Sequence, residues 1–251
     1  GYPTTLANKT FLNNIASRDS TVIKKLKNAG AILLGKLNLH NIAFGTTNES
    51  SYYGPTHNPW NTEFITGGSS GGSGAAVAAS LCTAAMGSDT GGSVRIPSAL
   101  CGIVGLKPTY GRVSCYGVIP LSWSQDHPGP MTRNVLDSAI LMNSIAGYDP
   151  KDPFTSQEPV PDFTETLNKG ISGTKIGIPT TYFFDGLDTE VKDSIGKAIS
   201  VLTGLGAIIQ EISLPHIEYS GHLRNHISMV EAANYHEQLL KSHAEKLTPN
   251  V

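Results

Sequence analysis

Charge, cysteine and long apolar runs are all scarce in this 251-residue chain. Charged residues make up 15% of it and the formal net charge is −2, so no basic field would attract nucleic acid or an anionic membrane surface. No apolar run reaches the length that crosses a membrane. We therefore expect a protein with no nucleic-acid contact and no membrane association.

Cysteine occurs only three times, as Cys82, Cys101 and Cys115, an odd number with no close pair. This usage disfavours a disulfide framework or a cysteine-based zinc site, and it fits a reducing compartment. We expect a cytoplasmic protein that holds no metal. The first residue is Gly1 rather than methionine, and we expect the sequence to be a fragment or a processed chain.

Helix and strand patterns alternate along the chain and predict an α/β protein with a mixed β-sheet core flanked by helices. One layered domain is expected over residues 1–251, with a short flexible connection at 150–161. The polar, turn-rich residues 45–66 are expected to form a loop. Helices are predicted over 17–29, 75–86, 132–147, 189–205 and 229–247, strands over 31–35, 174–179 and 207–215, and a strand and turn over 102–114.

Glycine and serine concentrate in "TGGSSGGSGAAVAA", residues 66–79. Flexible linkers have such a composition, but this stretch runs without a break into a buried-looking, alanine-rich helix. A phosphate loop would need a lysine here, and none occurs. The pattern G-x-S-x-G of a nucleophile elbow does occur, centred on Ser70, and this alternative stays open. Against it, the preceding residues make a poor buried strand, and Asp126 and His127 are sequence neighbours that could not readily serve as separate triad members.

A second glycine-serine cluster, "GSDTGGSVRIPS", lies beyond that helix at residues 87–98. A helix with returns at both ends can bring the two clusters together. Ser69 and Ser93 would then suit a relay, in which one hydroxyl attacks and the other passes the proton to a base. The backbone N–H groups that would form an oxyanion hole belong to Thr90, Gly91, Gly92 and Ser93.

These two clusters resemble the signature of the amidase signature family. The segments "GYPTT", "DSTVIKKLKNAGAILLGKLN", "YGPTHNPWN" and "DHPGPMTR" are similar to further family stretches, in the family's order. The resemblance implies amide hydrolysis without a metal or organic cofactor. It implies a triad of a nucleophilic Ser93, a bridging Ser69 held on a cis peptide bond, and a lysine.

The family places its lysine upstream of the "GYPTT" equivalent and continues beyond the position of Val251. The resemblance therefore implies a fold that is incomplete at both ends, and we expect residues 1–251 alone to be inactive. Asp89 and Arg95 are expected to pair and brace the loop of the second glycine-serine cluster, which we call the second loop. Ser70 is left open between tuning the relay and bonding the loop backbone. Structural roles are expected for Ser73, Lys36 and His127.

The resemblance leaves two functions open, of which the first is favoured. One is a stand-alone amidase that converts a small-molecule carboxamide to an acid and ammonia or an amine, either as a monomer or as a homodimer. The other is the A subunit of a glutamyl-tRNA amidotransferase, which would release ammonia from glutamine for partner subunits. The segment "PLSWSQDHPGPMTR" is more similar to the stand-alone enzymes. Copurification of partner subunits would distinguish the two.

Overall fold

The computed structural model describes residues 2–248 and divides them into two compact units. The first unit takes in the chain up to Thr164 and again from Ile227, and the second is Glu165–His226. The single domain over residues 1–251 stays a prediction. The predicted flexible connection at 150–161 ends before the boundary at Thr164, and Asp152 and Thr155 within it are buried and hydrogen-bonded.

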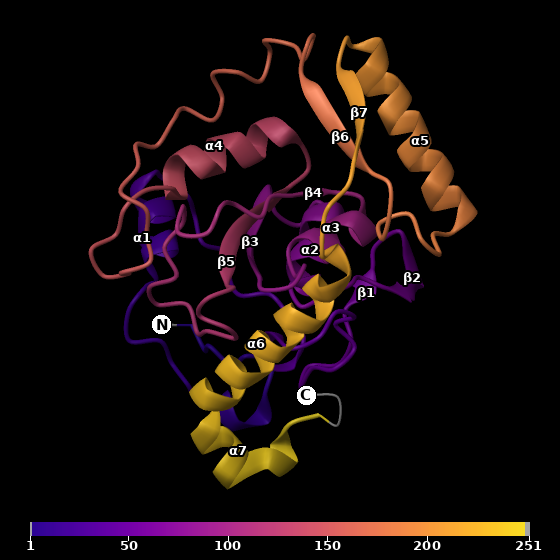
Figure 1. Cartoon of the computed structure of the whole chain (residues 1–251). Coiled ribbons are helices and arrows are strands. Elements are labelled where there is room, and N and C mark those ends of the chain that lie inside the picture. The colour runs from indigo at the N-terminus through magenta and orange to yellow at the C-terminus, as the bar shows by residue number, and fades with distance from the viewer. Residues whose placement is uncertain (1, 249–251) are drawn as a thin grey trace. The chain divides into compact units, whose positions relative to one another are not determined.

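The first unit is built on an antiparallel three-stranded sheet in the order β3-β5-β4, formed by Ala84–Asp89, His127–Thr132 and Val104–Gly105. The β3–β5 register pairs Asp89 with His127 at one end and Ala84 with Thr132 at the other. In Figure 1, α2 lies beside β3 and β5, α3 packs on α2 and β4, and α4 lies beside β5, in agreement with their contacts. The bounds of these helices are Gly71–Ala78 for α2, Arg95–Cys101 for α3 and Val135–Ile145 for α4.

A hydrophobic cluster joins α4 to α1, Thr21–Asn28. Ser20 caps α1 by accepting from the N–H of Ile23 at 3.4 Å, and the amphipathic pattern of the helix turns Val22 inward. Lys25 in the same helix donates to the carbonyls of Ile145 and Ala146 at the end of α4, at 3.2 and 2.8 Å. These contacts satisfy carbonyl groups that the helix itself leaves unpaired.

The remaining elements of the first unit are short. A hairpin of β1 (His57–Asn58) and β2 (Asn61–Ile65) lies before α2. The last helix, α7, is Glu237–His243. Single 3-10 turns occur at Lys9–Phe11, Asn41–Ala43 and Ala244–Lys246.

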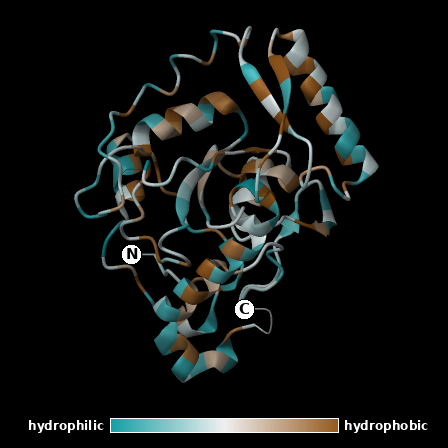
Figure 2. Ribbon diagram, viewed as in Figure 1, coloured by the Kyte–Doolittle hydropathy of each residue, from teal (hydrophilic) through white to brown (hydrophobic). Residues whose placement is uncertain are grey.

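The second unit contains a parallel pair, β6 (Lys175–Pro179) and β7 (Ile208–Ile212), joined through helix α5, Thr189–Gly204. Figure 2 shows hydrophobic and hydrophilic residues interleaved around α5, as its sequence pattern predicts. A 3-10 turn at Ile217–Tyr219 leads into α6, Ser220–Tyr235, which passes into the first unit at Ile227. The α/β class is confirmed, with parallel and antiparallel pairs distributed over three small sheets.

The helix predicted over 75–86 is wrong at both ends. The helix begins at Gly71 inside the glycine-serine stretch and ends at Ala78, while residues 84–86 belong to β3. Ser80 takes a positive φ of 58° and reverses the chain between helix and strand. Small residues are compatible with either state, so tertiary packing decides here and overrides the low helix propensity of glycine.

Two further expectations about strands are also wrong. Residues 31–35 form no strand among the described residues, and Ile32 and Leu34 in this extended segment are 86% and 71% exposed. An apolar run becomes a strand only where a neighbouring strand completes its hydrogen bonds. Conversely, residues 45–66 are not entirely loop, because they contain the β1–β2 hairpin.

Candidate active site

The two glycine-serine clusters lie against each other at the end of β3. The first leads into α2, and β3 then carries the chain back to the second cluster, which leads into α3. The N–H of Ser70 donates to the carbonyl of Ser93 at 3.2 Å and joins the two loops directly. The predicted meeting of the two clusters is therefore confirmed at the level of the backbone.

Ser69 and Ser93 are both buried, at 1% and 8% exposure. The Gly68–Ser69 peptide bond is cis, as the resemblance implies, and the carbonyl of Ser69 accepts from the N–H of His40 at 2.9 Å. Within residues 2–248, neither the Ser69 nor the Ser93 hydroxyl forms a hydrogen bond, so the direct bond expected between them is not made. Both hydroxyls are thus free of structural hydrogen bonds.

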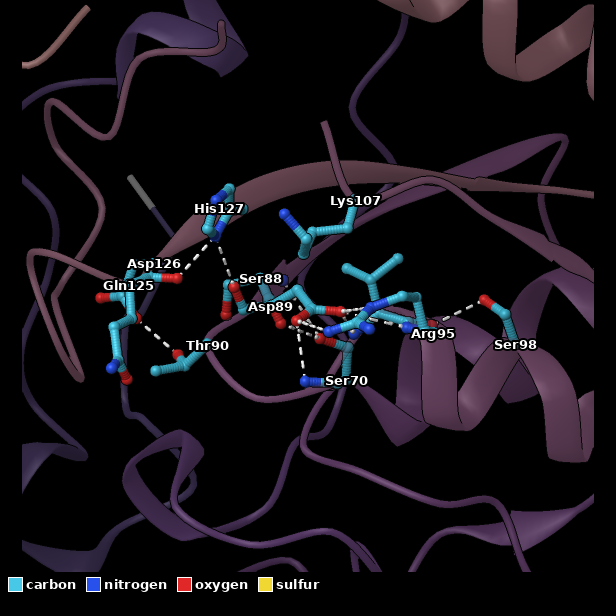
Figure 3. Close-up of polar contacts among 12 residues, drawn as sticks. Ser70, Ser88, Asp89, Thr90, Arg95, Ser98, Lys107, Gln125, Asp126 and His127 are labelled. Atoms are coloured by element: carbon cyan, nitrogen blue, oxygen red, sulfur yellow. Dashed lines mark hydrogen bonds and ion pairs between the residues drawn. The ribbon is translucent and has the colours of Figure 1, made fainter. Parts of the chain in front are cut away.

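Ser70 and Ser73 are bonded differently, because both hydroxyls are tied to β3. The Ser70 hydroxyl donates to the carbonyl of Ser88 at 3.3 Å and accepts from its N–H at 3.2 Å (Figure 3). The Ser73 hydroxyl donates to the carbonyl of Met86 at 2.9 Å, which agrees with its expected structural role. At Gly87, between these two strand positions, a Cβ atom would come within 2.8 Å of the Ser70 Oγ, so this close approach requires glycine.

Asp89, the last residue of β3, organises the second loop from a fully buried position. Its carboxylate accepts from the N–H of Gly92 at 2.7 Å and of Val94 at 3.2 Å, and it pairs with the guanidinium of Arg95 through two contacts of 3.0 Å. The expected pair between Asp89 and Arg95 is therefore present and braces the loop. Burial acts to raise the pKa of Asp89, but these hydrogen bonds outweigh it and hold the pKa below its usual value.

The four predicted oxyanion donors are not equivalent. The N–H of Gly92 already donates to Asp89, whereas those of Thr90, Gly91 and Ser93 have no hydrogen-bond partner in the part of the chain that the structure describes. Gly92 has a φ of 123°, a conformation that side-chain-bearing residues rarely adopt. The loop therefore presents three unpartnered amides, and the fourth is held by the buried carboxylate.

Asp126 is a second buried carboxylate at the site, and the sequence indicated no role for it. It lies directly before β5, opposite the end of β3, and accepts a hydrogen bond from the Thr90 hydroxyl (Figure 3). The N–H groups of Leu121 and Ser122 donate to its other oxygen at 2.8 and 3.0 Å. Burial raises its pKa above the usual value, and these hydrogen bonds only partly offset the effect.

His127 and Lys36 both have hydrogen-bond partners outside the two serines. Nδ1 of His127 lies 3.1 Å from the carbonyl of Asp89 and 2.5 Å from that of Gln125, so it carries the proton and acts structurally, as expected. Lys36 donates to the Thr4 hydroxyl.

Lys107 lies two residues after the end of β4, and no motif in the sequence marks it. It is close enough to Asp89 and Arg95 for both charges to influence its pKa. Burial lowers that pKa, Asp89 opposes the change and Arg95 adds to it. Lys107 is therefore part of the electrostatic surroundings of the second loop.

No group of three or more His, Cys, Asp or Glu side chains that could hold a metal ion occurs among residues 2–248. The three cysteines are free thiols. Cys101 is fully buried, and burial raises its pKa to about 11, so it behaves as a small apolar side chain. No helix in the described residues is both long and apolar enough to cross a membrane.

The family model "Amidase" matches residues 1–250, and the chain belongs to this family. Curated relatives of high similarity carry the name of the A subunit of glutamyl-tRNA(Gln) amidotransferase. The relative from Geobacter sp. strain M21 is 51% identical over 88% of this chain, and that from Trichlorobacter lovleyi is 53% identical over the same share. The chain spans 45% of the length of each relative.

Solved structures of the family have the same fold. The A subunit of glutamyl-tRNA(Gln) amidotransferase from Thermotoga maritima matches 93% of this chain and 52% of its own, with 44% identity and a TM-score of 0.91. A bacterial aryl acylamidase of the amidase signature family matches 99% of this chain and 54% of its own, with 32% identity and a TM-score of 0.87. The chain is thus similar to members of the family with different named activities.

Proposed function

We propose that this chain carries the nucleophilic part of an amide-cleaving site, with Ser93 as the residue that forms the acyl-enzyme. The observation that carries the proposal is the surroundings of Ser93. Its hydroxyl is free of structural hydrogen bonds within residues 2–248, its loop presents three unpartnered amides, and the loop that holds Ser69 is bonded to its carbonyl. Ser70 is less suited to the role because its hydroxyl is already bonded in both directions to β3.

The proposed reaction follows from this arrangement. The Ser93 hydroxyl attacks the amide carbonyl carbon while its proton passes through the Ser69 hydroxyl to a neutral lysine. The oxyanion accepts hydrogen bonds from the free amides of the loop, each worth about 3 kcal/mol to the transition state. The C–N bond breaks as the proton returns to the leaving nitrogen, and water then releases the acid from Ser93. No step of this scheme calls for a metal or an organic cofactor.

Two observations bear on how the relay would work. Hydroxyls of a catalytic relay are often unaligned without substrate and tighten only when it binds, so the missing bond between Ser69 and Ser93 is compatible with the scheme. Burial lowers the pKa of Lys36, as a base would need, but its only hydrogen bond within residues 2–248 is to the Thr4 hydroxyl and not to Ser69 or Ser93. The base of this scheme is therefore proposed to be a lysine other than Lys36.

The second candidate function is that of the A subunit of a glutamyl-tRNA(Gln) amidotransferase. The names of the relatives at 51% and 53% identity favour it over a stand-alone amidase. Under this proposal the carboxamide is that of glutamine, and the ammonia passes to another protein of the complex. We also propose a cytoplasmic location, for which the three free thiols are the support.

The test compares four serine variants of the whole protein that carries these residues, assayed for ammonia release from a panel of carboxamides that includes glutamine. Ser93→Ala should lower kcat/KM by at least about 1000-fold, and Ser69→Ala by about 100-fold or more. Ser70→Ala should have a smaller effect. Ser73→Ala is the matched control, since it also removes a buried hydroxyl bonded to β3, and it should change kcat/KM less than about threefold.

Retention of more than a tenth of the wild-type activity by Ser93→Ala would contradict the proposed nucleophile. Activity on glutamine that depends on copurifying subunits would select the amidotransferase. Activity of the isolated protein on other carboxamides would select the stand-alone amidase.

A further inference from the structure

Helix α6 is bonded to the segment 121–126 through the carboxylate of Glu231. The Ser122 hydroxyl donates to this carboxylate at 2.6 Å, and Ser124 donates to it twice, from its N–H at 3.1 Å and from its hydroxyl at 2.7 Å. One turn earlier on α6, the Ser228 hydroxyl donates to the side-chain carbonyl of Gln125 at 2.6 Å. These hydrogen bonds together hold the segment to the helix.

The same segment ends in Asp126, which bonds both within the segment and to the second loop. Its Oδ2 accepts from the N–H groups of Leu121 and Ser122 and so closes the segment into a compact turn. Its Oδ1 accepts from the hydroxyl of Thr90 on the loop that precedes Ser93. A continuous series of hydrogen bonds therefore runs from Glu231 through Ser122 and Asp126 to Thr90.

Thr90 needs this anchor because of its place in the chain. It follows the last residue of β3 and precedes Gly91 and Gly92, which offer the backbone little conformational restraint. Asp89 fixes the far side of the loop, toward α3, by holding the amides of Gly92 and Val94. The near side, next to β3, contains the amides of Thr90 and Gly91, which have no partner within residues 2–248. It is fixed by the Thr90 hydroxyl.

We propose that Asp126 and Glu231 are positioning residues for amide cleavage, and that they orient the amides of Thr90 and Gly91 through the Thr90 hydroxyl. The inference rests on the proposed function of Ser93, and it extends that function to residues outside the family's glycine-serine clusters. A displacement of donor groups by about 1 Å can cost a reaction about 100-fold in rate. The series of bonds therefore predicts an effect on kcat from α6, an element that itself contributes no reacting group.

The test measures steady-state kinetics of the whole protein on its best amide substrate. Thr90→Val removes the hydroxyl at constant shape and should lower kcat by about 10- to 100-fold with a change in KM below about threefold. Thr90→Ser keeps the hydroxyl and should restore kcat to within about threefold of wild type. Glu231→Ala should lower kcat about tenfold. In the double variant with Thr90→Val, kcat should fall no further than in Thr90→Val alone, since both changes break the same series.

The matched control is Thr132→Val at the opposite end of the β3–β5 ladder. Thr132 is fully buried, and its hydroxyl donates to the carbonyl of Asn134 at 2.8 Å. This variant should lower Tm to a similar extent as Thr90→Val and leave kcat within about twofold of wild type. Equal kcat in Thr90→Val and Thr132→Val, or fully multiplicative effects in the double variant, would overturn the inference.

Hydrogen exchange gives a second readout that needs no turnover. Loss of the Thr90 anchor should also loosen the adjacent residues of the loop, so the amides of Gly92 and Val94 should exchange at least about tenfold faster in Thr90→Val and Glu231→Ala, and at the wild-type rate in Thr132→Val. If the wild-type protein shows no Ser93-dependent activity, the proposed function fails, and the exchange rates still test the positioning. Unchanged exchange in both variants would overturn the positioning even in an active enzyme.

Discussion

Asp89 and Asp126 are two buried carboxylates at neighbouring strand ends, and they hold the two sides of one loop by different means. Asp89 ends β3 and Asp126 precedes β5, whose first residue pairs with Asp89. Asp89 accepts from a guanidinium and several amides. Asp126 accepts from two amides and a hydroxyl, and none of its donors within residues 2–248 is a cation. The pKa of the first lies below its usual value and that of the second above it.

The difference shows that amide and hydroxyl donors alone do not offset the burial of a carboxylate here, whereas amides together with an arginine do.

The opposite pKa shifts of Asp89 and Asp126 also give the stability of the fold opposite dependences on pH. The folded state gains stability from ionised Asp89 at neutral pH and loses it as the pH falls below the ordinary value of about 4. For Asp126 the sign is reversed, because its raised pKa means that protonation as the pH falls toward about 4 favours the folded state.

The largest expected effect follows from removing Asp89. Asp89→Ala leaves the Arg95 guanidinium without this acceptor and the amides of Gly92 and Val94 unpaired, and should lower the free energy of unfolding by about 3 to 5 kcal/mol. Equilibrium denaturation of the whole protein at pH 7 measures this loss. Asp137→Ala is a control at a partly exposed carboxylate that accepts one hydrogen bond from the side-chain amide of Asn134, and it should cost less than about 1 kcal/mol.

The second prediction concerns a variant in which Asp89, like Asp126, keeps amide donors but has no cationic donor. Arg95→Met removes the cation and keeps the amide donors, so the pKa of Asp89 should rise above its usual value. The free energy of unfolding at pH 7 should fall by about 2 kcal/mol, and part of the loss should be recovered near pH 5. Arg133→Met is the control, since this arginine donates to the carbonyl of Cys82. If Arg95→Met loses further stability on acidification from pH 7 to pH 5, the guanidinium is not what separates the two carboxylates.

How much of this arrangement could be predicted from sequence depends on the range of each contact. The Asp89–Arg95 pair lies within one short motif and is predictable from it, whereas the cis bond follows from the family resemblance of the glycine-serine clusters. The Thr90–Asp126 bond spans 36 residues and depends on the β3–β5 register. The Ser122–Glu231 bond spans 109 residues and needs the position of α6. Hydrogen bonds between residues so far apart in the chain leave no pattern in the sequence around either residue.

The secondary structure shows the same limit. Helices with polar caps and an apolar stripe are predictable to within a few residues, as α1 shows: residues 17–29 are expected and the helix is Thr21–Asn28. The alanine-rich stretch reads as one helix, because small residues carry little preference and no residue pattern marks the turn at Ser80. The apolar run at residues 31–35 has the composition of a strand but forms no ladder in the described chain.

A smaller effect is expected from Asp126→Asn, which removes the titration and can turn one acceptor oxygen into a donor facing the amides of Leu121 and Ser122. Its cost in the free energy of unfolding should be about 1 to 2 kcal/mol at pH 7. That cost should grow as the pH falls toward about 4, because only the wild type gains stability from protonation. Asp89→Asn should show the opposite trend. Parallel pH profiles for the two variants would show that the carboxylates do not differ in the way described.

The smallest effect is expected at Lys107, whose charge influences Asp89 from a distance. Lys107→Met should raise the pKa of Asp89 slightly, and the free energy of unfolding should change by less than about 0.5 kcal/mol. The acid midpoint of unfolding, measured at low and high salt, tests this. The difference from wild type should vanish at high salt, since screening removes long-range interactions first. A difference that persists at about 1 M salt would mean that Lys107 holds Asp89 through a direct contact.

The most direct test of Ser93 as the nucleophile is the site at which a serine-directed fluorophosphonate attaches to the whole protein. The probe phosphonylates the attacking oxygen, and peptide mass spectrometry identifies the residue. We predict a single adduct on Ser93, lost in Ser93→Ala and retained in Ser73→Ala. An adduct on Ser70 would contradict this assignment and restore the nucleophile elbow as the explanation of the glycine-serine stretch.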